Sequence, residues 1–349
     1  MDKVEGPSLY HRLRPLLFRL DPETAHHLTV HLMTLAGSLP PVRWLLRRMF
    51  PIPETDLSVD VLGMKFRNPI GLAAGFDKDG RALQGLACLG FGFLEAGTVT
   101  PLPQEGNPRP RIFRLPEDRA LTNYMGFPNT GALRLLEKVK KLKLSDVRLG
   151  INIGKNTATP IEESAGDYLE LLEMFAPYAG YLAVNVSCPN LSGLSRLQGR
   201  AELESLLGQL AQARAALEGK AGHVPLLVKI SPDLEPGELE DVVGVCMDSG
   251  VEGIIATNTT TKREGLVSTA CETTGGLSGA PLEGRATDVV RRVRKLTGGK
   301  LAVIGVGGVF DADSARAKLD AGADLVQVYT GMIYEGPGVV SEILRGFVS

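Results

Sequence analysis

Eight short apolar runs alternate with longer stretches of helical periodicity from about Asn68 to the end of the chain. Short apolar runs are typical of strands that are covered on both faces, as in a parallel sheet. Eight strand–helix units in about 280 residues predict an α/β fold of the TIM (β/α)8 barrel type. The runs are Ile70–Ala74, Gly92–Ala96, Leu149–Ile153, Leu182–Val186, Leu226–Ile230, Gly253–Ala256, Ala302–Gly305 and Leu325–Tyr329. The clearest helical stretches between them are Ile161–Met174, Ala201–Leu217, Glu238–Met247 and Ala286–Leu296.

Polar and glycine-rich turns follow these runs, among them the turns at residues 75–78, 98–100 and 257–259. A barrel enzyme builds its site from the loops at the C-terminal ends of its strands. A doubly wound open sheet is the alternative architecture. It is less favoured because such a sheet concentrates its site at one switch point, whereas here nearly every run ends in such a turn.

The run that ends at Asn185 carries the most specific signal. It continues as Asn185-Val-Ser-Cys-Pro-Asn190, so that two amides bracket Cys188. An unperturbed thiol titrates at about 8.5, and Cys188 is the side chain of this segment that can take up a proton near neutral pH. Asn185 and Asn190 offer donors and acceptors to a planar polar substrate. The alternative is a buried strand followed by an ordinary Pro-Asn turn.

Two lysines lie in or beside the predicted strands. Lys78 follows the first run, where it either holds an anion or the electron-rich end of a flavin ring, or is a solvated loop residue. Lys229 lies inside an apolar run, and a buried ammonium needs a partner. That partner is either a reduced flavin, which carries negative charge, or a carboxylate on a neighbouring strand.

Further candidate ligand groups come from other loops. The Gly307-Gly308 turn lies where barrels bind phosphate, because glycines let backbone N–H groups approach an anion. Asn123 and Asn258 join the two amides beside Cys188 in matching a pyrimidine-like ring with alternating C=O and N–H groups. Turn capping is the usual alternative for a single asparagine, but four at strand ends indicate a substrate cradle.

The first 50 residues do not share the strand–helix rhythm. Leu9–Leu20 and Glu23–Leu35 predict amphipathic helices joined at Asp21-Pro22, where Asp21 suits the N-cap and Pro22 the first helical position. Seven Lys or Arg and four Asp or Glu give this segment a charge of +3. A basic, apolar helical pair suits an anionic membrane surface. The alternative is a helical cap on the barrel floor or lid. We expect residues 1–50 to form an extension and residues 51–349 the barrel domain.

Composition limits the classes of function. The net charge of −2 gives no support for nucleic-acid binding. The four cysteines have neither metal-type nor disulfide-type spacing, so we expect a reducing compartment and no metal site. The chain has no apolar run of bilayer length and no signal peptide at its start. These features predict a cytoplasmic protein, and the basic, apolar helices would allow it to rest on a membrane.

Taken together, these segments resemble the dihydroorotate dehydrogenases, and in particular their class 2, quinone-dependent branch. The resemblance implies a TIM barrel that binds FMN and oxidises dihydroorotate to orotate for pyrimidine biosynthesis, with a membrane quinone as final electron acceptor. The matching motifs are Asn68–Lys78, Gly97–Pro101, Gly106–Arg114, Asn123–Phe127, Gly150–Asn156, Asn185–Asn190, Thr257–Thr260, Thr274–Gly279 and Ile304–Gly308.

The resemblance also implies roles for individual residues. Position 188 matches the catalytic base, and His26 and Arg114 match positions that face a quinone tunnel; a plain helix-surface histidine is the alternative for His26. FMN would be held by Ala74, Gly75, Lys78, Thr98, Asn152, Asn185, Lys229, Thr257, Gly279, Gly308, Tyr329 and Thr330. The substrate would be held by Lys78, Asn123, Tyr124, Met125, Gly126, Phe127, Asn185, Asn190, Asn258 and Thr259.

The chain departs from its branch at two places. Class 2 members usually carry serine as the base and class 1 members cysteine, so Cys188 is a class 1 feature; Ser195 and Arg196 also stand in the reverse of the usual order. The alternative is therefore a soluble, class 1-like enzyme that uses fumarate or NAD. The N-terminal helices and the Arg114 motif favour class 2, for which we expect a peripheral location on the cytoplasmic face of the cell membrane.

Overall fold

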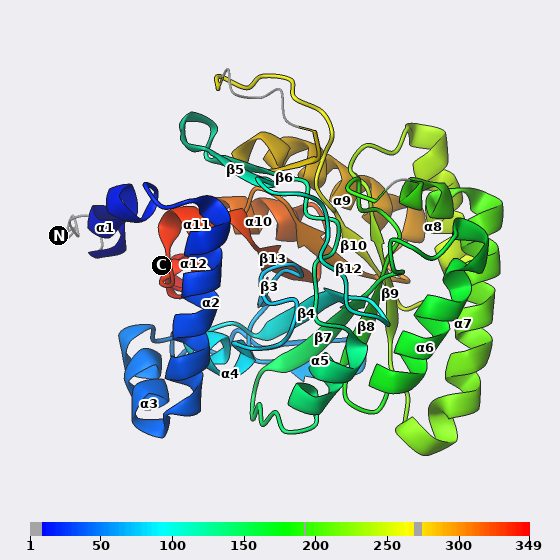
Figure 1. Cartoon of the computed structure of the whole chain (residues 1–349), viewed down its shortest axis with the longest axis horizontal. Coiled ribbons are helices and arrows are strands. Elements are labelled where there is room, and N and C mark those ends of the chain that lie inside the picture. Colours follow the sequence, from blue (N-terminus) through cyan, green and yellow to red (C-terminus); the bar gives the residue numbers. More distant parts are fainter. Residues whose placement is uncertain (1–8, 192, 269–273) are drawn as a thin grey trace.

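Eight parallel strands close into a barrel in the computed structural model, which describes residues 9–191, 193–268 and 274–349 (Figure 1). Each strand neighbours the next barrel strand along the chain, and the last pairs with the first. The prediction of a TIM barrel is confirmed, and the open sheet is excluded. The strands are β3 Ile70–Leu72, β4 Phe93–Val99, β7 Arg148–Ile153, β8 Tyr181–Asn185, β9 Leu226–Ile230, β10 Gly253–Ala256, β12 Ala302–Val306 and β13 Leu325–Val328.

Helices cover the outside of the barrel and bury many apolar side chains of its strands in one large core cluster. The four predicted helical stretches are confirmed, with ends that shift by a few residues. The helices are α4 Leu83–Leu86, α5 Ala132–Val139, α6 Ser164–Phe175, α7 Arg200–Ala221, α8 Pro236–Asp248, α9 Glu283–Thr297, α10 Ala312–Asp320, α11 Thr330–Glu335 and α12 Val339–Val348. Short 3-10 turns are η1 Ala87–Leu89, η2 Pro116–Asp118, η3 Ile161–Glu163, η4 Leu194–Gln198 and η5 Ala280–Leu282.

A small hairpin closes the amino end of the barrel. Its strands are β1 Val59–Val61 and β2 Met64–Phe66, which the apolar pattern did not predict. The ring of Phe66 packs edge-on against that of Phe93, with centroids 5.5 Å apart. Together with other inward-facing side chains of the barrel strands they form a second core cluster.

A three-stranded antiparallel sheet lies at the opposite end of the barrel. It consists of β5 Ile112–Leu115, β6 Ala120–Asn123 and β11 Gly276–Gly279. β11 pairs with β6, so that Gly276 stands opposite Asn123. This pairing joins two motifs about 150 residues apart at the mouth of the barrel.

The N-terminal extension consists of α1 Leu9–Leu17, α2 Pro22–Ser38 and α3 Pro40–Met49, which stand beside the barrel in blue in Figure 1. Asp21 caps α2 as predicted, because its carboxylate accepts from the backbone N–H of Thr24 at 2.9 Å. α2 packs closely on α4: a Cβ on Gly37 would lie 2.5 Å from the backbone nitrogen of Gly85. The extension therefore packs on the side of the barrel rather than on its floor, and the division at residue 50 stays a prediction.

The extension exposes many large apolar side chains. No helix among the described residues is both long and apolar enough to cross a bilayer. The exposed side chains are Leu9, Leu13, Leu16, Leu20, Leu28, Leu32, Leu35, Leu39, Trp44, Leu45 and Met49.

Candidate active site

A cavity of about 1140 Å³, its open mouth included, lies at the carboxyl end of the barrel. Nearly all of the predicted site residues line it, although they come from many separate loops. From the predicted sets these are His26, Ala74, Gly75, Lys78, Thr98, Asn123, Met125, Gly126, Phe127, Asn185, Cys188, Asn190, Lys229, Thr257, Asn258, Thr259, Gly279, Gly308, Tyr329 and Thr330. Their individual roles stay predictions.

Three predicted residues are not part of the cavity lining. Asn152 is buried behind Thr98, whose hydroxyl donates to its side-chain oxygen at 2.6 Å. Tyr124 is 38% exposed. Arg114 stacks on the ring of Phe18, 4.7 Å from its centroid, and so contacts the N-terminal extension.

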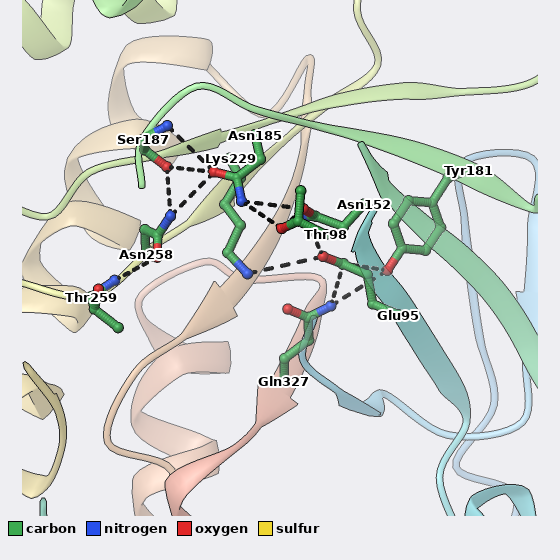
Figure 2. Close-up of polar contacts among 10 residues, drawn as sticks. All are labelled: Glu95, Thr98, Asn152, Tyr181, Asn185, Ser187, Lys229, Asn258, Thr259 and Gln327. Carbon is green, nitrogen blue, oxygen red and sulfur yellow. Dashed lines mark hydrogen bonds and ion pairs between the residues drawn. The ribbon is translucent and has the colours of Figure 1, made fainter. Parts of the chain in front are cut away.

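The amides at the carboxyl ends of β8 and β10 form one hydrogen-bonded cluster (Figure 2). The side-chain nitrogen of Asn185 donates to the Thr98 hydroxyl at 3.0 Å and to the Asn152 oxygen at 3.2 Å. Asn258 donates in turn to Asn185 at 3.2 Å and to the hydroxyl of Ser187 at 3.0 Å. Because these bonds fix which end of each amide is the donor, the cluster is preorganised for directed hydrogen bonding.

Glu95 lies at the centre of a second polar cluster inside the barrel (Figure 2). It accepts from the Tyr181 hydroxyl at 2.8 Å, from Asn152 at 2.9 Å and from Gln327 at 2.6 Å. Its carboxylate also lies 3.9 Å from the ammonium of Lys229. Lys229 is therefore paired with a carboxylate, as one of the two predictions proposed, but this carboxylate lies across the barrel and not on a neighbouring strand. Lys229 lines the cavity as well.

Burial shifts the protonation of the cationic groups that line the cavity. Burial lowers the pKa of Lys229, against the attraction of Glu95 and then Cys188. Burial likewise lowers the pKa of Lys78 to about 8. The ammonium of Lys78 donates to the carbonyl of Gly75 at 2.8 Å, so this lysine is not a solvated loop residue.

The thiol of Cys188 is buried, with 7% of the residue exposed. Burial raises its pKa to about 11, although the backbone N–H of Asn190 and the charges of Lys229 and Lys78 oppose this shift. The expectation of a thiolate close to neutral pH is therefore wrong for this structure, because desolvation outweighs the nearby cations. Cys88 and Cys246 are likewise free and buried, while Cys271 lies outside the described residues.

His26 reaches the cavity from α2. Its ring packs edge-on against Phe76 with centroids 5.3 Å apart. Burial, and then the charge of Lys78, lowers the pKa of His26 to about 3. The imidazole is therefore neutral at physiological pH and forms part of the cavity wall, which a plain surface histidine would not.

Two buried polar atoms of cavity-lining residues lack a hydrogen-bond partner within the part of the chain that the structure describes. They are the side-chain oxygens of Asn190 and Gln327. Burying such an atom unpaired costs about 1–3 kcal/mol. These acceptors therefore indicate a ligand that donates hydrogen bonds.

The predicted phosphate turn has the required backbone shape. Gly307 and Gly308 have φ angles of 119° and 74°, and a Cβ on Gly308 would lie 2.3 Å from that of Glu283. The hydroxyls of Ser278 and Thr330 lie 2.9 Å apart and line the same cavity. Glycine backbone and two hydroxyls are donors suited to one phosphate group.

Sequence reasoning missed several residues of the site. Glu95 lies inside an apolar run and was read as part of a strand. A single carboxylate in such a run was the signal that could have identified it, because a buried carboxylate needs polar partners. Ser278 and Gln327 line the cavity as well. Ser278 lies in β11, which no apolar run predicted, and Gln327 interrupts the run of the last strand.

The sequence profile described as dihydroorotate dehydrogenase matches residues 56–349. The chain belongs to the dihydroorotate dehydrogenase family. A relative named dihydroorotate dehydrogenase (quinone), from Methylococcus capsulatus, is 49% identical over 335 residues, which cover 95% of this chain and 97% of the relative. The relative of the same name from Burkholderia thailandensis is 47% identical and covers 97% of both chains.

Solved structures agree with this dihydroorotate dehydrogenase fold. A crystal structure of DHODH from Eimeria tenella in complex with ferulenol has a TM-score of 0.83 and 37% identity. The match covers 94% of this chain and 90% of that one. The names of the relatives specify a quinone, which places this chain in the class 2 branch rather than the class 1 alternative.

Proposed function

We propose that this chain oxidises dihydroorotate to orotate, with FMN as hydride acceptor and a membrane quinone as final electron acceptor, in the synthesis of pyrimidine nucleotides. The observation that carries the proposal is the cavity itself. It brings Cys188, four asparagines, the buried Lys229 and the half-buried Lys78 together at one barrel mouth. A thiol, amides and cations in one cavity suit proton removal from an anionic, amide-containing ring.

The residues present fit a flavin with a single phosphate. Gly308, Ser278 and Thr330 offer donors for that phosphate, and Lys229 offers positive charge to the ring. The same cavity is shared by the predicted substrate residues, so ring and substrate would lie in contact. When bound, FMN supplies the ring that accepts the hydride from carbon 6 of dihydroorotate.

The chain's own residues supply the proton chemistry. Cys188, as thiolate, accepts the proton from carbon 5 as the hydride leaves carbon 6. Asn190, Asn123 and Asn258 hold the ring by its C=O and N–H groups. The loop after β8, of which residues 188–191 and 193–198 are described, would exclude water from the substrate during this step.

The N-terminal extension fits the quinone half of the reaction. His26 lines the cavity from α2, and α1–α3 expose a large apolar surface. Arg114 contacts the start of the extension through Phe18. An exposed apolar face on a basic segment supports peripheral binding to an anionic bilayer, from which a lipid-soluble quinone would reach the flavin. We propose the cytoplasmic face of the cell membrane as its location.

The decisive experiment separates the two half-reactions. The flavin released on denaturation should be FMN; release of FAD contradicts the proposed cofactor. Under anaerobic conditions dihydroorotate should bleach the flavin absorbance of the purified protein. The reduced protein is then mixed with a quinone, with fumarate or with NAD. Rapid reoxidation by quinone alone supports the proposal, whereas reoxidation by fumarate or NAD alone supports the class 1-like alternative.

A further inference from the structure

A buried ion pair ties the N-terminal extension to the barrel. Glu23, in the first turn of α2, and Arg111, just before β5, are 6% and 5% exposed. Nη2 of Arg111 donates to Glu23 Oε1 at 2.7 Å, and Nε lies 3.2 Å from both carboxylate oxygens. Burial raises the pKa of Glu23, but the hydrogen bond and charge of Arg111 outweigh it and the net pKa is lowered.

The other side of the same guanidinium holds a loop. Nη1 of Arg111 donates to the carbonyl of Glu105 at 2.6 Å and to that of Asn107 at 2.8 Å. Arginine suits this position because its rigid, planar fork presents donors in two directions at once. Glu23 thus orients the fork that fixes residues 105–107.

Asn107 carries the contact into the predicted substrate site. Its backbone N–H donates to the carbonyl of Met125 at 2.9 Å, and its side chain donates to the carbonyl of Asn190 at 3.3 Å. Asn190 donates in turn to the side-chain oxygen of Asn123 at 2.7 Å. The chain of contacts therefore runs from α2 to three residues of the substrate cradle.

We propose that Glu23 and Arg111 are positioning residues, through which the N-terminal extension sets the affinity of the cavity for the pyrimidine substrate. The identity of that substrate rests on the proposed function. A basic, apolar extension would by itself serve only membrane binding and quinone use, and not the oxidation of the substrate. The contacts of Glu23 make the extension part of both.

Charge and burial favour this role over simple packing. A carboxylate removed from a buried pair leaves the guanidinium unpaired in a desolvated site, and the fork loses its fixed orientation. Residues 105–107 and Asn190 then lose a common anchor. Weakening one link of such a network is expected to change ligand affinity by roughly 3- to 30-fold.

Two variants and one matched control test the proposal on the full-length flavoprotein. Glu23→Gln keeps the shape but removes the charge. Arg111→Lys keeps the ion pair but loses the fork, and so guards against a variant that fails to fold. The control is Arg109→Gln: Arg109 lies 3.1 Å from the same carboxylate, but its side chain is 66% exposed, and among the described residues it donates no hydrogen bond to residues 105–107.

Orotate is titrated against each protein by the change in flavin absorbance, and flavin reduction is measured at saturating dihydroorotate. We expect Glu23→Gln and Arg111→Lys to weaken orotate binding by roughly 3- to 30-fold while the saturated reduction rate stays within about twofold. Arg109→Gln should match wild type. Orotate affinity within twofold of wild type in both test variants would overturn the proposal.

Amide hydrogen exchange separates this inference from the proposed function. Glu23→Gln should raise exchange at residues 105–107 and again near Asn190, and Arg109→Gln should not. If wild type fails to bind orotate, the proposed function fails, and amide exchange alone tests whether Glu23 positions the residues around Asn190. Raised exchange near Asn190 in Glu23→Gln then supports that positioning role, and unchanged exchange overturns it.

Discussion

The ammonium of Lys229 lies 3.9 Å from the carboxylate of Glu95 inside the barrel, and the two residues are only 5% and 1% exposed. The carboxylate also accepts hydrogen bonds from Tyr181, Asn152 and Gln327. One buried carboxylate therefore orients four side chains from four different strands.

Replacing Glu95 should destabilise the fold strongly. Glu95→Leu leaves the Lys229 ammonium and three donors without their acceptor, and breaking a buried pair costs about 3–5 kcal/mol. The apparent thermal midpoint should fall by several degrees or more. Glu240, exposed on α8, provides the control Glu240→Leu. Equal midpoints for the two variants would show that the Glu95 cluster contributes little to stability.

Cys188→Ala should keep the flavin and bind orotate. Its rate of flavin reduction should be lower than that of wild type by roughly 10²-fold or more, the usual scale for loss of a general base. Cys188→Ser should react faster than Cys188→Ala and need higher pH for its full rate. Stopped-flow flavin reduction by dihydroorotate measures both. A wild-type rate in Cys188→Ala would make Cys188 a structural cysteine only.

The pH dependence of flavin reduction should reflect Cys188 and Lys78 together. The Cys188 thiolate is populated only as pH approaches its pKa of about 11, whereas Lys78 loses its charge above about 8. If the reaction requires both the Cys188 thiolate and the Lys78 ammonium, the second-order rate constant for flavin reduction by dihydroorotate should rise up to about pH 8. Above pH 8 it should stay level, because the gain in thiolate is offset by the loss of ammonium. In Lys78→Met, at a lower overall rate, the rise should continue past pH 8. A wild-type profile that falls from pH 6 to 8 contradicts this assignment.

Acid should destabilise the protein through His26. Its folded pKa of about 3 lies below its ordinary value of 6.5. The unfolded chain therefore binds the proton first, and stability is lost as pH falls below about 6.5. His26→Gln should show a smaller drop in urea midpoint between pH 7.5 and 5 than wild type. His31→Gln, an exposed change on the same helix, should show the wild-type drop.

Membrane binding should depend on the exposed leucines of the extension. Leu16 and Leu32 are 61% and 52% exposed, so Leu16→Glu with Leu32→Glu should leave the fold intact while placing charge on the apolar face. Co-sedimentation with anionic vesicles should fall markedly. Leu133→Glu, at a 67% exposed position of α5, should sediment like wild type. Equal sedimentation of all three proteins argues against this face as the docking surface.

The barrel was predictable because its strands are apolar on both faces and its polar turns recur at one end. The same rule failed for β1, β2, β5, β6 and β11, which are short and belong to small antiparallel sheets outside the barrel. Their residues alternate too briefly to stand out from loops.

Cavity residues were largely predictable because family motifs place them at strand ends. Their protonation was not, since the pKa of Cys188 depends on how much water surrounds it, which spacing does not reveal. Nor did any pattern indicate that Glu23 would meet Arg111, 88 positions away. Such a pair becomes visible only when α2 is placed against β5.

The β1–β2 hairpin determines from which end ligands can enter the barrel. With Phe66 packed against Phe93, it closes the amino end of the barrel. The water-soluble substrate and the lipid-soluble quinone of the proposed reaction must then both reach the cavity from the carboxyl end of the barrel. They are kept apart by the different parts of the cavity wall through which they enter.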